Sequence, residues 1–213
     1  MSGTYMRDGM RSAKLWVVFV SLCLSLLGAV KAFADTGEPQ KIVEKVTTEL
    51  FGEVKKLSSG EITEADYKEE VKTILERVVN FPFIAANVMG QQAYGKASAT
   101  QRNAFSEVFR DGLVNSYSKG ISGYADSEIR VVSATQDPRN AKRVTVAQEV
   151  NDKGTIHKLD YTMVQGKTGD WKVINVTLNG VNLGMSFSSQ FKSSMRKYGN
   201  DLDKVIAGWL ADV

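Results

Sequence analysis

The sequence predicts an α+β domain, in which helices pack around one twisted four-stranded antiparallel sheet and enclose an apolar pocket. Apolar residues recur at helical spacing up to about residue 126, which predicts helices in this part. Four segments in which apolar and polar residues alternate then follow, separated by turn-forming sequences. Helical spacing returns after residue 184, so the chain order is helices, sheet and helices again.

The first half predicts four helices. The first covers 41–57 and ends at a serine–glycine turn. Thr63 opens the second, because Asp66 follows three residues later in the manner of a capping box. Pro82 suits the first turn of a short third helix that runs to Met89. The fourth and longest helix is capped by Ser98 or Thr100, reaches about Tyr124 and carries one dense apolar stripe.

The second half predicts an antiparallel meander followed by two helices. The expected strands are 128–136, 141–150, 155–165 and 170–178. Strict alternation puts Trp171 and Val173 on one face of the fourth strand, and Ile174, Val176 and Leu178 on the other. A strand with two apolar faces is central or has a second apolar layer over it. After a turn at 180–184, helices are expected over 185–198 and from Asp201 or Asn200 onward.

The first 34 residues have the pattern of a cleavable signal peptide. A positively charged start is followed by an uncharged apolar run over 15–30 and by the small-x-small triplet Ala32-Phe33-Ala34. The run is short for a membrane span, which needs about 20 residues. We therefore expect cleavage after Ala34 and a mature chain, 35–213, that forms one domain. A retained membrane anchor is the alternative.

Removal of this leader changes the charge and the cysteine content. The leader holds four of the 27 lysines and arginines and one of the 24 acidic residues, so 23 of each remain. A near-neutral chain argues against nucleic-acid binding, which needs a basic face. The single cysteine, Cys23, leaves with the leader, which excludes a disulfide or a thiolate site in the mature chain. An exported chain without disulfides suits a bacterial periplasm.

Catalytic groups are few. The sequence has one histidine, His157, and one histidine without cysteines provides no metal site of the usual kind. Asp160 is a weak acid–base candidate, because alternation points it away from the apolar face of its strand. Apolar and aromatic side chains are in excess instead, and they fill either a solid core or a lipid-sized cavity lined with methionines.

Two stretches carry a family resemblance. FPFIAANVMG with ATQRNAFSEVFRDGLVNSYSKGI, and DWKVINVTLNGVNLGMSFSSQF with GNDLDKVIAGWL, resemble the MlaC family of periplasmic phospholipid-binding proteins, also called toluene-tolerance proteins. The likeness spans nearly the whole mature chain in the same order. It implies helices around a twisted sheet with a deep apolar pocket, and a protein that is not an enzyme and has no cofactor besides its bound phospholipid.

The resemblance also implies a function and partners. Family members carry phospholipid between an outer-membrane lipoprotein–porin complex and an inner-membrane ABC transporter complex with its periplasmic substrate-binding subunit, and so maintain outer-membrane lipid asymmetry. We expect a monomer that does not bind nucleic acid. The candidate lipid-binding residues are Phe83, Met89, Phe105, Phe109, Tyr117, Tyr161, Met163, Trp171, Val173, Val176, Val181, Leu183, Phe187 and Phe191.

One departure and two alternatives remain. Family members often carry a basic residue in the stretch held here by Ser188-Ser189, so Lys192 or Arg143 is the candidate to contact a lipid phosphate. One alternative function is an isomerase or dehydratase of a cone-shaped α+β fold that acts on an apolar substrate through His157 and Asp160. The other is an interaction protein or periplasmic chaperone with an exposed aromatic patch.

Overall fold

The computed structural model describes residues 36–209. The predicted signal peptide lies outside these residues. Six helices and five strands follow one another in the described part, and their order is helices, sheet, helices as predicted. The elements are α2 (Gly37–Ser58), α3 (Glu64–Val78), α4 (Phe81–Lys96), α5 (Ala99–Ser122), β1 (Glu128–Asp137), β2 (Asn140–Asp152), β3 (Thr155–Gln165), β4 (Trp171–Leu178), β5 (Val181–Asn182), α6 (Leu183–Lys197) and α7 (Leu202–Ala207).

Two helices begin with complete capping boxes. At the start of α3, the Thr63 hydroxyl accepts from the backbone N–H of Asp66, whose carboxylate accepts from the backbone N–H of Thr63. At the start of α5, Ser98 and Gln101 exchange the same pair of hydrogen bonds, at 3.1 and 3.0 Å. Each pair satisfies backbone donors that a helix start leaves free, so both boundaries follow from the local sequence.

Helix α4 is longer than predicted and is broken in the middle. It runs to Lys96 instead of ending at Met89, and Gly90 interrupts it with φ 73° and ψ 163°. This backbone conformation is open almost only to glycine. Gly90 therefore lets the chain change direction and begin a second helical segment over 91–96.

The sheet is an antiparallel meander in the order β1-β2-β3-β4-β5. It has one strand more than the four predicted, because Val181 and Asn182 fold back against the end of β4. The fifth strand has only two residues, and alternation cannot be recognised over so short a segment. The left-handed backbone of Asn179 and Gly180, at φ 48° and 83°, forms the tight turn that makes this pairing possible.

A register shift in β4 corrects the predicted assignment of its faces. Met163 pairs with Val173, whereas Tyr161 pairs with Val176, so one extra residue of β4 lies between these two pairs. Such a bulge reverses the alternation beyond it. Val176 therefore lies on the same face as Val173, against the prediction from strict alternation.

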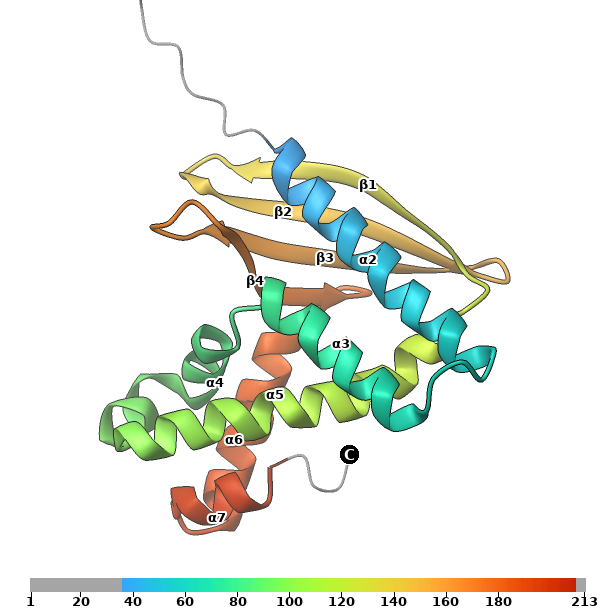
Figure 1. Ribbon diagram of the computed structural model, residues 1–213. Helices are drawn as coiled ribbons and strands as arrows, with labels where there is room; N and C mark the ends of the chain where they lie inside the picture. The colour runs from blue at the N-terminus through green and yellow to red at the C-terminus, as the bar shows by residue number, and fades with distance from the viewer. Residues whose placement is uncertain (1–35, 210–213) are drawn as a thin grey trace, which may run out of the picture. The chain divides into compact units, whose positions relative to one another are not determined.

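One face of the sheet is covered by helices, and we call it the inner face. Helix α2 crosses β1 and β2, while α3, α4 and α6 pack against β4 (Figure 1). The remaining helices, α5 and α7, pack on α3, α4 and α6, and form a helical layer on the β4 side of the sheet (Figure 1). The opposite, outer face carries mainly polar and charged side chains of β2 and β3.

Candidate functional site

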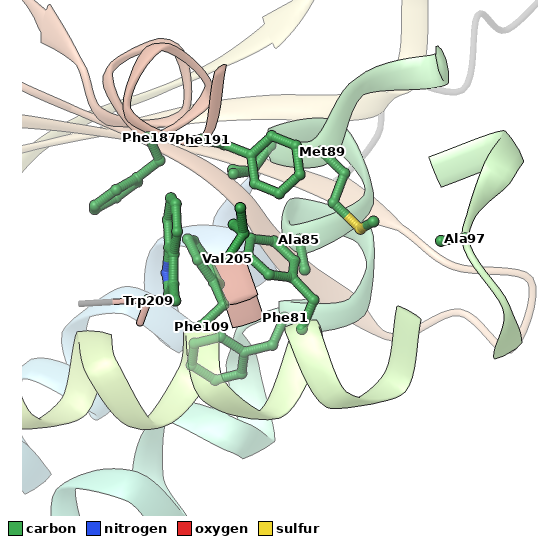
Figure 2. Packing of buried hydrophobic residues seen from close by; sticks show 11 residues of the cluster. Phe81, Ala85, Met89, Ala97, Phe109, Phe187, Phe191, Val205 and Trp209 are labelled. Atoms are coloured by element: carbon green, nitrogen blue, oxygen red, sulfur yellow. The ribbon is translucent and has the colours of Figure 1, made fainter. Parts of the chain in front are cut away.

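The helical layer contains a cluster of buried aromatic side chains, which we call the helical cluster. Phe105 of α5 lies at its centre, with its ring edge-on to Phe191 and Trp209, at centroid distances of 5.1 Å in both cases. Figure 2 shows these rings gathered from α4, α5, α6 and the segment after α7. Six of the predicted lipid-binding residues belong to this cluster or pack against it: Met89, Phe105, Phe109, Leu183, Phe187 and Phe191.

A second group of predicted residues lies on the inner face of the sheet and forms the sheet cluster. Met163, Trp171 and Val173 are buried there, and Tyr161 and Val176 pack against them from the same face. Val43 of α2 covers this group from above. Val79, between α3 and α4, packs against both the helical and the sheet cluster, so the two groups are neighbours.

Three predicted lipid-binding residues are exposed. The exposed fractions are 45% for Phe83, 39% for Tyr117 and 55% for Val181. Partial burial raises the pKa of the Tyr117 hydroxyl, so this side chain stays neutral well above physiological pH. These three side chains border the clusters from the surface instead of lying inside them.

The centre of the inner face is the part that the helices cover least. Here Leu159 and Tyr161 of β3 pair with Leu178 and Val176 of β4, and all four side chains are half-buried. Sequence reasoning left Leu159 and Leu178 out of the site. The signal for Leu159 was available, since it stands two residues before Tyr161 on the same face. The signal for Leu178 was hidden by the bulge in β4.

A short polar chain crosses this apolar face. The Tyr161 hydroxyl donates to the amide oxygen of Gln148 at 2.9 Å, and the Gln148 amide nitrogen donates to the Thr47 hydroxyl at 2.8 Å. Gln148 is buried, and burial raises the pKa of the Tyr161 hydroxyl, so the chain is neutral. It ties α2 to β2 and β3 without placing a charge on the inner face.

A groove of about 790 Å³ lies between α4, the start of α5, α6 and α7. Of the predicted lipid-binding residues, only Met89 and Phe191 line it, so it differs from the pocket expected between helices and sheet. Lys192 lines it as well. Arg143, the other candidate for a phosphate contact, lies on β2 and forms an ion pair with Asp137 at 3.7 Å. The structure therefore separates the two candidates.

The groups that an enzyme would need are not brought together. His157 lies edge-on to the Tyr124 ring on the inner side, whereas Asp160, three residues along β3, points to the outer face. Within residues 36–209, no three His, Cys, Asp or Glu side chains are placed to hold a metal ion. No helix in that same range is both long enough and apolar enough to cross a membrane.

Comparison with known proteins gives three matches. The model of a family described as MlaC protein matches residues 44–211. Toluene tolerance protein Ttg2D of Pseudomonas putida is 33% identical over 177 residues, which cover 82% of this chain and 81% of that protein. A phospholipid-binding protein from Ralstonia solanacearum, solved in complex with a phospholipid, matches with a TM-score of 0.68 and 18% identity over 79% of this chain and 92% of its own.

These matches confirm several predictions from the sequence. The structural match confirms the α+β fold, with helices around one antiparallel sheet. The family match confirms the resemblance carried by the two quoted stretches, and with it the expectation that the protein is not an enzyme. From the family model and the 33% identical relative, it follows that this chain belongs to the MlaC family.

Proposed function

We propose that this protein is a periplasmic phospholipid carrier, which shuttles phospholipid between outer- and inner-membrane complexes and so maintains outer-membrane lipid asymmetry. One observation carries the proposal: the chain shares its fold, over 79% of its length, with a protein solved in complex with a phospholipid. Membership of the MlaC family and the relative named for toluene tolerance support it.

The physical requirement for a carrier is shelter for the acyl chains. Burial of one methylene group is worth about 0.8 kcal/mol, so a diacyl lipid with on the order of 30 of them loses roughly 20 kcal/mol or more on entering water unaided. An apolar surface enclosed by protein offsets this loss. The half-buried patch of Leu159, Tyr161, Val176 and Leu178, between the helical and sheet clusters, is the surface we assign to the acyl chains.

Address and partners complete the proposal. The leader sends the chain to the periplasm and is cleaved after Ala34, which leaves a near-neutral domain with no membrane anchor. The partners are the ABC transporter complex with its substrate-binding subunit in the inner membrane, and the lipoprotein–porin complex in the outer membrane. These points extend the family resemblance to this chain, and the mass of the protein recovered from the periplasm tests the cleavage site.

The lipid-binding surface is tested by one substitution on each face of the sheet. Val176→Glu puts a carboxylate on the inner face, whereas Val164→Glu puts the same group on the outer face, where its strand neighbours are Arg143 and Lys172. A carboxylate beside acyl chains costs well over 1.4 kcal/mol, so we expect uptake of fluorescent phospholipid from vesicles to fall at least about tenfold for Val176→Glu alone.

A second inner-side variant separates binding from folding. Val181→Glu changes an exposed side chain and should leave the unfolding midpoint within about 0.5 kcal/mol of the wild type while it weakens uptake. Equal uptake by Val164→Glu, Val176→Glu and Val181→Glu proteins would refute the assigned surface. The shuttle step is measured as protein-dependent transfer between donor and acceptor vesicles that a porous membrane keeps apart.

A further inference from the structure

The groove between α4, α6 and α7 has walls that are unlike the inner face of the sheet. Helix α4 breaks at Gly90, and its second segment, 91–96, forms one wall. The C-terminal half of α6 and the beginning of α7 form the other. The lining combines apolar side chains, four side-chain amides and three cations: Met89, Gly90, Gln91, Gln92, Ala93, Lys96, Ala97, Gln101, Phe191, Lys192, Met195, Arg196, Asn200 and Leu202.

The charges in this lining are all positive. Lys96, Lys192 and Arg196 line the groove, and no carboxylate does. Among the described residues, none of these three cations has an ion-pair partner; the Arg196 guanidinium donates only to the Ser193 hydroxyl of its own helix, at 2.9 Å. Lys192 and Arg196 are one helical turn apart, where like charges destabilise a helix. A bound anion would relieve this repulsion, and a concave wall of one charge sign concentrates such anions.

The floor of the groove is apolar and continuous with the core. Met89, Ala97 and Phe191 line the groove and are also buried members of the helical cluster. Figure 2 shows the Met89 side chain beside the ring of Phe191, on the side of the cluster toward Ala97. An anion with an apolar portion therefore finds both a charged rim and an apolar floor. The groove volume lies in the range of small-ligand sites, about 300–1,000 Å³.

We propose that this groove binds the phosphate group of an amphiphile, with Lys96, Lys192 and Arg196 as the cations that hold it. Guanidinium and ammonium groups form charge-assisted hydrogen bonds with phosphate oxygens, and the four side-chain amides supply further donors. The phosphate belongs either to a lipid headgroup or to a small soluble ester. In the first case the inference rests on the proposed function, and in the second it is independent of it.

The test compares a groove variant with a variant of equal charge change elsewhere. The groove variant carries Lys192→Gln and Arg196→Gln, and the control carries Lys142→Gln and Lys167→Gln, two exposed lysines in β2 and the β3–β4 turn. Three probes are titrated calorimetrically into the mature protein: dihexanoyl phosphatidic acid, dihexanoylglycerol, which has the same tails without phosphate, and inorganic phosphate. The thermal unfolding midpoint of each variant verifies that it is folded.

The expected result is a loss of affinity for dihexanoyl phosphatidic acid of at least about tenfold in the groove variant and none in the control, since one charge-assisted contact is worth about 1.5–3 kcal/mol. Inorganic phosphate binding as tightly as the lipid would assign the groove to a soluble phosphate. Equal affinities of groove variant and control would overturn the proposal. Uptake of long-chain phospholipid by the same proteins tests the proposed function separately, because the groove lies apart from the Val176 surface.

Discussion

At the scale of single residues, stability rests on a few fully buried rings. Phe105 contacts Phe109, Phe191 and Trp209 and has no exposed surface. Burial of such a side chain is worth about 1.5–3 kcal/mol, and its removal also leaves a cavity. The apolar stripe of the sequence predicts that Phe105 is buried, but the stripe alone does not separate a core ring from one that lines a ligand pocket.

Phe105→Ala should lower the free energy of unfolding by about 3–5 kcal/mol, because the surrounding rings cannot close the space. Phe83→Ala is the matched control, since that ring is 45% exposed and its loss should cost less than about 1 kcal/mol. Urea unfolding followed by circular dichroism gives both values. Similar losses in the two variants would show that Phe105 is not at the centre of the packing.

The buried tyrosine of α3 gives a pH dependence. The Tyr67 hydroxyl donates to the backbone carbonyl of Ser118 at 3.0 Å, and burial raises the pKa of Tyr67 to about 12 from 10. The folded state thus favours the neutral hydroxyl, and the stability this contributes is complete below pH 10 and is lost as the pH rises from 10 to 12, by up to about 1.4 kcal/mol per pH unit.

Tyr67→Phe removes the titrating group and should cost about 1 kcal/mol near pH 7 through the lost hydrogen bond. Because the variant has no Tyr67 proton to lose, its deficit relative to the wild type should shrink between pH 10 and 12. Urea unfolding at several pH values measures the difference, in which all other titrating groups cancel. A deficit that stays constant across this range would contradict the assignment.

At the scale of elements, local chemistry and long-range pairing differ in how well the sequence predicts them. The starts of α3 and α5 follow from capping residues within three positions of each other, and both are confirmed. The bulge in β4 and the two-residue strand β5 depend on pairing with β3 and β4, which no local pattern encodes. For this reason the sequence predicts the meander but misplaces Val176 and omits Leu178 from the site.

The break in α4 is an element-scale feature with a direct test. Gly90 adopts a backbone conformation that costs other residues about 1–3 kcal/mol, although a Cβ atom there would meet no neighbour within 4 Å. Gly95, in the same helix, has equally free space and no left-handed φ. Gly90→Ala should therefore destabilise the protein by about 1–3 kcal/mol, whereas Gly95→Ala should stabilise it by about 0.4–1 kcal/mol.

Thermal and urea unfolding of the two alanine variants give the comparison. Because both substitutions add the same methyl group to open space, only the backbone conformation distinguishes them. A stabilising effect of Gly90→Ala would mean that α4 is continuous through residue 90 and that the segment 91–96 does not form a separate wall of the groove.

At the scale of the whole molecule, the predicted lipid-binding residues divide between two neighbouring clusters. The sequence predicts which residues are apolar and which faces they share, and the family resemblance supplies the reason to consider them together. Their division into a helical and a sheet cluster follows from how α2 and α6 lie on the sheet, which depends on contacts far apart in the chain. The basic groove joins residues of α4, α6 and α7 and has no signature in the sequence for the same reason.

The most direct test of the carrier account is native mass spectrometry of the mature protein purified from the periplasm of its cells. The account predicts a protein mass that corresponds to cleavage after Ala34, together with co-purified phospholipid at a fixed stoichiometry that is released on denaturation. A protein that is recovered empty, and that takes up no phospholipid when it is mixed with vesicles, would contradict the account.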